Sequence, residues 1–290
     1  MREIKVTDMR VIPGDASFMV DDGITAVLVD TGFGFTGPAL VEKVKAYLGD
    51  RNLEYILMTH SHYDHVLGMP CMQDAYPDAK IIGARHAANV FEIDETIEIM
   101  RDMDTNQARL NGVEEYDFAA ERLKVDIIVE DGDIVECGTM KFEAVHLPGH
   151  TRCSFGFYEP DHKFLIAAET IGHSDGGWNV MPATWLVGIQ MGFDSIDKIL
   201  KYDVKTMLAP HAGHLNEEQT ANFLAKTRGL NEESIAYLKE SISAGMTNDE
   251  IMDGFKTRFR QHAKKDVAPV KAINLNLFHM INVIKREFSL

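Results

Sequence analysis

Short apolar and alternating runs dominate the first two-thirds of the chain and predict β-strands. The clearest run covers residues 24–30, where β-branched side chains lead into a Thr31-Gly32 turn. Similar runs predict strands at residues 4–12, 17–20, 55–59, 80–83, 125–129, 134–135, 140–146, 154–158, 163–167 and 206–209. Apolar residues at helical spacing in residues 38–48 and 85–103 predict helices between the strands. We therefore expect residues 1–212 to form a domain that mixes strands with helices.

A helical pattern takes over in the last part of the chain. It predicts helices at residues 216–227, 232–243, 248–264 and 269–288. Thr247 and Glu250 have the spacing of a capping box, and Gly245 can end the helix before them. The last helix carries an apolar stripe formed by Val270, Ile273, Leu277, Ile281, Ile284 and Phe288. Because such a stripe must be buried against another surface, we expect residues 213–290 to form a packed helical segment.

Composition and charge exclude several classes of protein. Hydrophobic residues make up 45% of the 290, which is enough to build a core and argues against wholesale disorder. The chain has 29 Lys and Arg against 45 Asp and Glu, so its formal charge is −16. This acidity argues against a nucleic-acid partner and against docking on an anionic membrane. No run approaches the ~20 apolar residues that cross a bilayer. Neither a signal-peptide pattern nor a disulfide framework is evident. We therefore expect a cytoplasmic protein.

Histidine is the residue type that points to chemistry. Three of the 12 histidines, together with one aspartate, occur in the segment Thr59-His60-Ser61-His62-Tyr63-Asp64-His65. This segment follows an apolar strand, so it is expected to be a loop at the end of that strand. Imidazole and carboxylate groups are ligands for zinc, iron or manganese. Alternate residues His60 and His62 can face one ion, while Asp64 and His65 turn toward another.

The His-x-His-x-Asp-His segment resembles the metal-binding loop of the metallo-β-lactamase superfamily, and two further motifs support the likeness. The family has a later histidine in a Pro-Gly-His-Thr setting, which here is His150 in Leu147-Pro148-Gly149-His150-Thr151. The early strand that ends in Asp30-Thr31-Gly32 also fits the family pattern. The resemblance implies that Asp30 is buried and forms hydrogen bonds around the ligand loop without touching metal.

Two family ligands leave alternatives open in this chain. The family usually places a bridging aspartate after the next strand, but here Glu169 follows the run of residues 164–168. Its longer side chain could bridge two ions or bind only one. The last ligand is a histidine after the final core strand. His211 lies where the pattern places it, directly at the strand end, and His214 is a competitor three residues later.

The resemblance covers roughly residues 10–215 and implies both a fold and a reaction. The fold is an α+β, αββα sandwich in which two β-sheets face each other with helices outside, here extended by the C-terminal helices. The resemblance implies a first metal site of His60, His62 and His150, a second site of Asp64, His65 and His211, and Glu169 as the bridge between them. The implied cofactors are two divalent ions, with zinc expected first and iron or manganese as alternatives.

Such a centre implies a metal-dependent hydrolase, in which a hydroxide held between the ions attacks an ester, thioester, lactone or phosphodiester of a small molecule. Asp64 is the candidate catalytic residue, because it can orient the nucleophile and transfer its proton. The C-terminal helices are expected to cover the site entrance or to form a homodimer. Fold and ligands do not name a substrate. The segment of residues 173–179, which holds one of the two tryptophans, is a candidate for a mobile substrate wall or for a surface loop anchored by a buried tryptophan.

Three other functions compete with hydrolysis. Di-iron oxygen or nitric-oxide reductases use the same scaffold, but their loop typically has a glutamate where this chain has His62, and they add a flavodoxin domain. A metal-containing sensor without turnover is a second alternative, although the complete ligand set argues against it. A nuclease is the third, and the charge of −16 argues against it.

Overall fold

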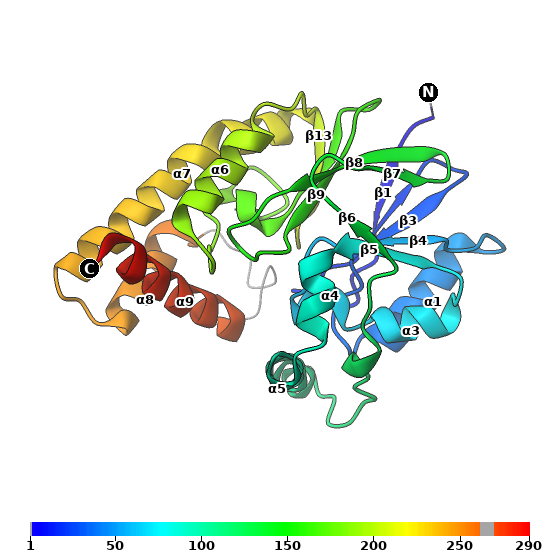
Figure 1. Ribbon diagram of the computed structural model, residues 1–290, viewed down its shortest axis with the longest axis horizontal. Coiled ribbons are helices and arrows are strands. Elements are labelled where there is room, and N and C mark those ends of the chain that lie inside the picture. Colours follow the sequence, from blue (N-terminus) through cyan, green and yellow to red (C-terminus); the bar gives the residue numbers. More distant parts are fainter. Residues whose placement is uncertain (1, 262–269) are drawn as a thin grey trace. The chain divides into compact units, whose positions relative to one another are not determined.

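The computed structural model describes residues 2–261 and 270–290. It has an α+β fold with two β-sheets flanked by helices and a helical C-terminal part, as predicted (Figure 1). The chain divides into two compact units. The first unit comprises Met1–His146 and Phe155–His162, and the second unit comprises Leu147–Ser154 and Lys163–Leu290.

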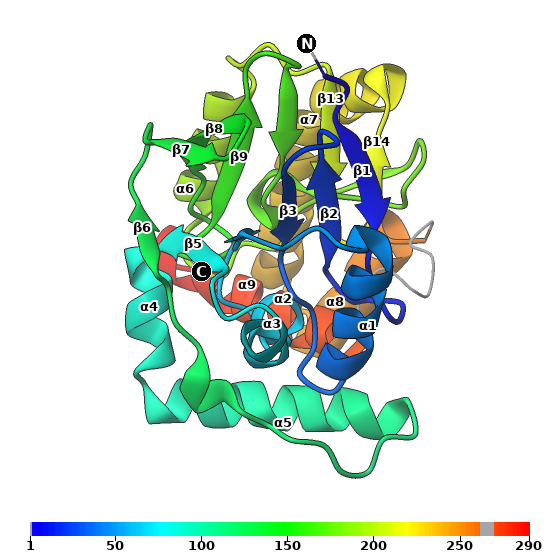
Figure 2. The same ribbon diagram turned by 90° about the vertical axis from the view of Figure 1, so that its right-hand side faces the viewer.

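The first unit contains a sheet with the strand order β1-β2-β3-β4-β5-β6. Its strands are β1 (Lys5–Asp8), β2 (Phe18–Asp21), β3 (Ala26–Val29), β4 (Tyr55–Leu57), β5 (Lys80–Ala84) and β6 (Ile127–Val129). The first three strands run antiparallel, and Figure 2 shows them side by side. From β3 to β6 the strands are parallel, and Val29 pairs with Leu57. The carboxyl ends of β3 and β4 are therefore neighbours, which places the segment after Val29 beside the histidine loop.

Helices and a three-stranded meander complete the first unit. The helices are α1 (Gly37–Leu48), α2 (Tyr63–Val66), α3 (Met69–Ala75), α4 (Arg85–Phe91), α5 (Asp94–Leu110) and a 3-10 turn, η1 (Ala120–Arg122). The meander consists of the antiparallel strands β7 (Ile134–Cys137), β8 (Met140–His146) and β9 (Phe155–Glu159). The helix predicted at residues 85–103 is two helices, because the backbone of Ile93 is extended and separates α4 from α5.

The second unit brings two other strand ends together. Its strands are β10 (Phe164–Ile166), β11 (His173–Ser174), β12 (Val180–Met181), β13 (Thr206–Ala209) and β14 (Gly213–Leu215), with a 3-10 turn, η2 (Glu169–Ile171). Strands β10 and β13 are parallel, and Ile166 pairs with Leu208. Since parallel strands end at the same edge of a sheet, Glu169 and His211 emerge beside each other.

Four helices make up the rest of the second unit: α6 (Ile189–Ile199), α7 (Glu217–Ser243), α8 (Asn248–Phe259) and α9 (Val270–Phe288). Residues 216–227 and 232–243 were predicted as two helices, but α7 is continuous. The apparent break contains Asn231, which is fully buried and donates from its side-chain amide to the Thr227 carbonyl oxygen at 2.8 Å. Its side-chain oxygen accepts a hydrogen bond from Ala183 N at 3.0 Å. Asparagine is usually disfavoured inside helices, and here tertiary contacts stabilise it.

The apolar stripe of α9 is buried within the same unit. Helix α9 packs against α6, α7 and α8, and Leu277, Ile281 and Ile284 are fully buried. The capping box of Thr247 and Glu250 is confirmed. Residues 262–264 and 269 of the predicted helices lie outside the described residues. Among the described residues, no helix combines the length and apolar character that crossing a membrane requires.

The histidine loop is tied to the turn after β3 by a close backbone contact at Gly68. A Cβ atom on Gly68 would lie 2.1 Å from the Thr31 carbonyl oxygen. Gly68 N donates to Gly32 O at 3.2 Å, and Thr31 N donates to His65 O at 2.6 Å. Only a residue without a side chain allows this approach, so Gly68 fixes the position of the helix that carries His65.

Replacing Gly68 with alanine should lower the free energy of unfolding by about 1–3 kcal/mol, because the added methyl group overlaps the Thr31 carbonyl. The matched control is Gly229→Ala in α7, where an added Cβ has no neighbour within 4 Å. That change should raise the free energy of unfolding by about 0.5–1 kcal/mol. Urea denaturation of both variants measures the difference, and equal stability of Gly68→Ala and the parent would contradict the close contact.

Candidate metal centre

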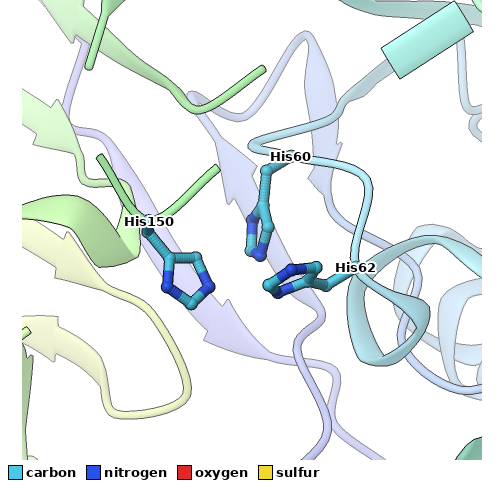
Figure 3. A group of neighbouring side chains, drawn as sticks. All are labelled: His60, His62 and His150. Atoms are coloured by element: carbon cyan, nitrogen blue, oxygen red, sulfur yellow. The ribbon is translucent and has the colours of Figure 1, made fainter. Parts of the chain in front are cut away.

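Three histidines of the first unit gather at the carboxyl end of β4. His60 and His62 lie in the loop after the strand, and Figure 3 shows their rings projecting from it. The ring centroids of His60 and His62 are 4.6 Å apart, and those of His60 and His65 are 4.0 Å apart. His60 and His65 are buried, as is Asp64 beside them in α2, whereas His62 is half-buried. The loop thus concentrates three imidazoles and a carboxylate in one place.

Asp30 holds this loop in position. Its Oδ1 accepts a hydrogen bond from Thr59 N at 2.8 Å, and its Oδ2 accepts one from Thr59 Oγ1 at 2.7 Å. The same Oδ2 lies 2.7 Å from Nδ1 of His65. Asp30 has a φ of 56°, a left-handed conformation that is uncommon outside glycine and that often marks functional sites. The side chain is buried and forms hydrogen bonds around the loop, in agreement with the sequence prediction for Asp30.

Glu169 is the centre of a second cluster, which lies entirely in the second unit. Its Oε1 lies 2.8 Å from Nε2 of His211, and its Oε2 lies 3.3 Å from Nε2 of His150 and 3.7 Å from Nε2 of His173. The glutamate is 6% exposed, and the three histidines around it are buried. A buried carboxylate with three imidazole nitrogens around it is an arrangement that suits a cation.

Two backbone features orient the histidines of this cluster. Nδ1 of His150, a residue also drawn in Figure 3, lies 2.7 Å from the Thr184 carbonyl oxygen, so it carries the ring proton and donates. His211 has a φ of 57° and points its side chain at Glu169. His214, the alternative ligand, is exposed on β14. The geometry therefore favours His211 over His214 as a partner of Glu169.

Two further buried residues lie near Glu169: His173, which begins the segment predicted as a substrate wall, and Arg260, which was not assigned a role from the sequence. His173 is 4% exposed, and its Nδ1 has no hydrogen-bond partner among the described residues. Burial lowers the pKa of His173 to about 3. Arg260, directly after α8, is 7% exposed, and burial lowers its pKa to about 10 although the charge of Glu169 acts to raise it. The sequence around Arg260 did not predict its burial, because an arginine in an amphipathic helix is expected on the polar face.

The two tryptophans after Glu169 have different surroundings. Trp178 is 54% exposed, so the segment of residues 173–179 is not anchored by a buried tryptophan. Trp185 is fully buried and donates from Nε1 to the Thr170 carbonyl oxygen at 2.8 Å. Trp185 therefore fills the core next to the Glu169 turn.

The hydrogen bonds of His65 and His150 fit a metal centre. Each ring has its Nδ1 next to an oxygen acceptor, Asp30 Oδ2 for His65 and Thr184 O for His150. The proton is then on Nδ1, and Nε2 keeps the lone pair with which a neutral imidazole binds a metal ion. Histidine ligands in proteins are commonly held by such a partner on the second nitrogen. Both units therefore contain a His/Asp/Glu cluster whose donor atoms fit divalent cations.

Comparisons with known proteins agree with this interpretation. A family model for the metallo-beta-lactamase superfamily matches residues 11–211. A hydroxyacylglutathione hydrolase from Pelagibacter ubique is 28% identical over 189 residues, which are 64% of this chain and 62% of that protein. The acyl-coenzyme A thioesterase MBLAC2 of Homo sapiens is 23% identical over 50% of this chain and 54% of its own length. The chain thus spans less than two-thirds of these curated relatives.

Solved structures show the same fold. A metallo-beta-lactamase family protein from Thermus thermophilus matches with a TM-score of 0.61 at 16% identity, covering 99% of this chain and 94% of that one. This likeness includes the C-terminal helices and confirms the predicted fold class. Since the family model matches most of the chain, the protein belongs to the metallo-beta-lactamase superfamily, a superfamily of metal-dependent hydrolases.

Proposed function

We propose that the protein is a hydrolase with two divalent metal ions, which acts on thioesters or related esters of small molecules. The first ion would be held by His60, His62 and His150, the second by Asp64, His65 and His211, with Glu169 between them. The observation that carries the proposal is the orientation of His65 and His150, whose Nδ1 atoms are engaged so that Nε2 can bind a metal.

Further support comes from the contacts within each unit. In the first unit the ring centroid of His60 lies 4.6 Å from that of His62 and 4.0 Å from that of His65. In the second unit Glu169 has nitrogen atoms of His211 and His150 at 2.8 and 3.3 Å. Imidazole and carboxylate donors suit zinc, iron and manganese, and we expect zinc first.

Bound ions of this kind supply a hydroxide near neutral pH and polarise the substrate oxygen. The chain's own residues would orient and move the proton. The buried carboxylate of Asp64 would accept a hydrogen bond from the nucleophile and hold it toward the substrate carbonyl. The same oxygen atom can take up the proton and return it to the leaving group, which is general acid–base chemistry.

The relatives suggest which substrates to try first. Those named are a hydroxyacylglutathione hydrolase and an acyl-coenzyme A thioesterase, and both names denote hydrolysis of an acyl group from sulfur. We therefore rank thioesters first, ahead of lactones, other esters and phosphodiesters. A homodimer through the C-terminal helices stays a prediction, and the apolar stripe of α9 does not require one because its central residues are buried within the chain.

The proposal is tested by measuring hydrolysis of a thioester, ester, lactone and phosphodiester panel by protein loaded with zinc, manganese or iron. We expect thioester turnover that a chelator abolishes and added metal restores. Metal analysis after native purification identifies the resident ion. Absence of hydrolysis with all three metals, together with oxygen reduction by the iron form, would instead favour the di-iron redox alternative.

Asp64→Asn should lower kcat for the best substrate by roughly 100- to 10,000-fold, because the amide cannot accept the proton of the nucleophile. Metal content is measured in the same preparation, since Asp64 is also a proposed ligand. The control is Asp102→Asn, an exposed position in α5 that should leave kcat unchanged. A rate for Asp64→Asn equal to that of the parent would remove Asp64 from the mechanism.

Asp30→Asn should weaken metal binding by about 10- to 100-fold, because His65 loses the carboxylate that holds its ring. The amide oxygen can still accept from Thr59 N, so the change is aimed at the ligand and not at the fold. Competition with a chromogenic chelator gives the affinity, and Asp102→Asn is again the control. Unchanged affinity would show that Asp30 only supports the loop.

A further inference from the structure

We propose that Arg260, together with His173, binds a carboxylate on the acyl part of the substrate. The inference rests on the proposed hydrolase function and names its substrate class. The substrates would be half-thioesters or half-esters of dicarboxylic acids, in which the second carboxylate lies a few atoms from the scissile carbonyl.

The first step in the argument is that Arg260 is buried and its Nε has no partner among the described residues. Only 7% of the residue is exposed, and its Nε donor has no hydrogen-bond partner among the described residues. No ion pair within 4.0 Å involves Arg260 in the part of the chain that the structure describes. Burying a charge is costly unless it is paired and hydrogen-bonded, so a buried guanidinium whose Nε has no partner among the described residues favours an anionic partner from elsewhere.

The second step is the location of Arg260. Nε2 of His173 lies 3.7 Å from Oε2 of Glu169, so these two side chains are neighbours. The charge of Arg260 acts on the pKa of His173 and that of Glu169 on the pKa of Arg260, which indicates that the guanidinium lies near this pair. Glu169 does not satisfy it, because that carboxylate already has nitrogen atoms of His211 and His150 at 2.8 and 3.3 Å. If Glu169 also binds metal as proposed, its charge is shared further and less of it remains for Arg260.

The third step is the chemistry that these side chains recognise. The guanidinium is a planar set of five donors whose fork matches the two oxygens of a carboxylate. His173 adds a buried Nδ1 that has no partner among the described residues and can donate to an oxygen when it carries the ring proton. Because both residues lie by the proposed reaction centre, the anion belongs on the acyl side of the scissile bond and not at the distant end of a thiol carrier.

The test compares two thioesters of N-acetylcysteamine, a leaving group without charge. One carries a succinyl group, and the other carries a 4-methylpentanoyl group, in which an uncharged isopropyl group replaces the carboxylate. Arg260→Gln should lower kcat/KM for the succinyl thioester by roughly 10- to 100-fold, the worth of a hydrogen bond to a charged group. It should leave the 4-methylpentanoyl thioester within about twofold of the parent.

The matched control is Arg258→Gln, which removes the same charge from an exposed arginine two residues earlier and should change neither substrate. Arg260→Lys keeps the charge without the planar fork, so it should give a smaller loss that is still confined to the succinyl substrate. If Arg260→Gln does not fold, this lysine variant decides the question. An equal loss for both substrates, or no loss for either, would overturn the proposal and leave Arg260 a structural counter-charge.

Isothermal titration of the metal-loaded protein with succinate gives a readout that does not depend on turnover. The parent and Arg258→Gln should bind succinate. Arg260→Gln should bind it at least tenfold more weakly, because the variant loses a hydrogen bond to a charged group, which contributes roughly this much. If the parent hydrolyses no thioester yet shows this difference, the hydrolase proposal fails while the anion site stands. If all three proteins bind succinate equally, the anion site fails, whatever the turnover.

Discussion

The buried carboxylate of Asp30 is the interaction on which the histidine loop depends. It accepts hydrogen bonds from the backbone and side chain of Thr59 and lies against Nδ1 of His65. A charge in this environment is tolerated only when its oxygens are hydrogen-bonded, so the end of β3, the start of the loop and α2 must keep their relative positions. The metal chemistry proposed for the loop therefore depends on Asp30, a residue that would itself contact no metal.

The two clusters share a common construction although they come from different parts of the chain. Each lies at the ends of a pair of parallel strands, β3 with β4 and β10 with β13. Each also contains one non-glycine residue in the left-handed region, Asp30 with a φ of 56° and His211 with a φ of 57°. Strain at such positions persists only where surrounding contacts fix the backbone, which is consistent with sites that must present side chains in one geometry.

The sequence was sufficient to predict the features that a local pattern or a family motif determines. The His-x-His-x-Asp-His loop, the buried role of Asp30 and the capping box at Thr247 could all be predicted, because each depends on residues close in sequence or on a family motif. It was insufficient where burial arises from tertiary packing. Asn231 reads as a helix break and Arg260 as a polar surface residue, and only the fold shows that both are buried. The choice between His211 and His214 also required the exposure of β14.

Helix α7 has a consequence for how the chain can be shortened. Asn231 accepts from Ala183 N, next to the Thr184 carbonyl that holds His150, and Thr227 donates to Ile171 O at the end of the Glu169 turn. A boundary drawn after residue 212 would cut off the side chains that brace two proposed ligands. The C-terminal helices are therefore part of the support for the proposed metal ligands. A protein truncated after residue 212 is expected to keep its ligand residues but to hold them less rigidly and bind metal more weakly.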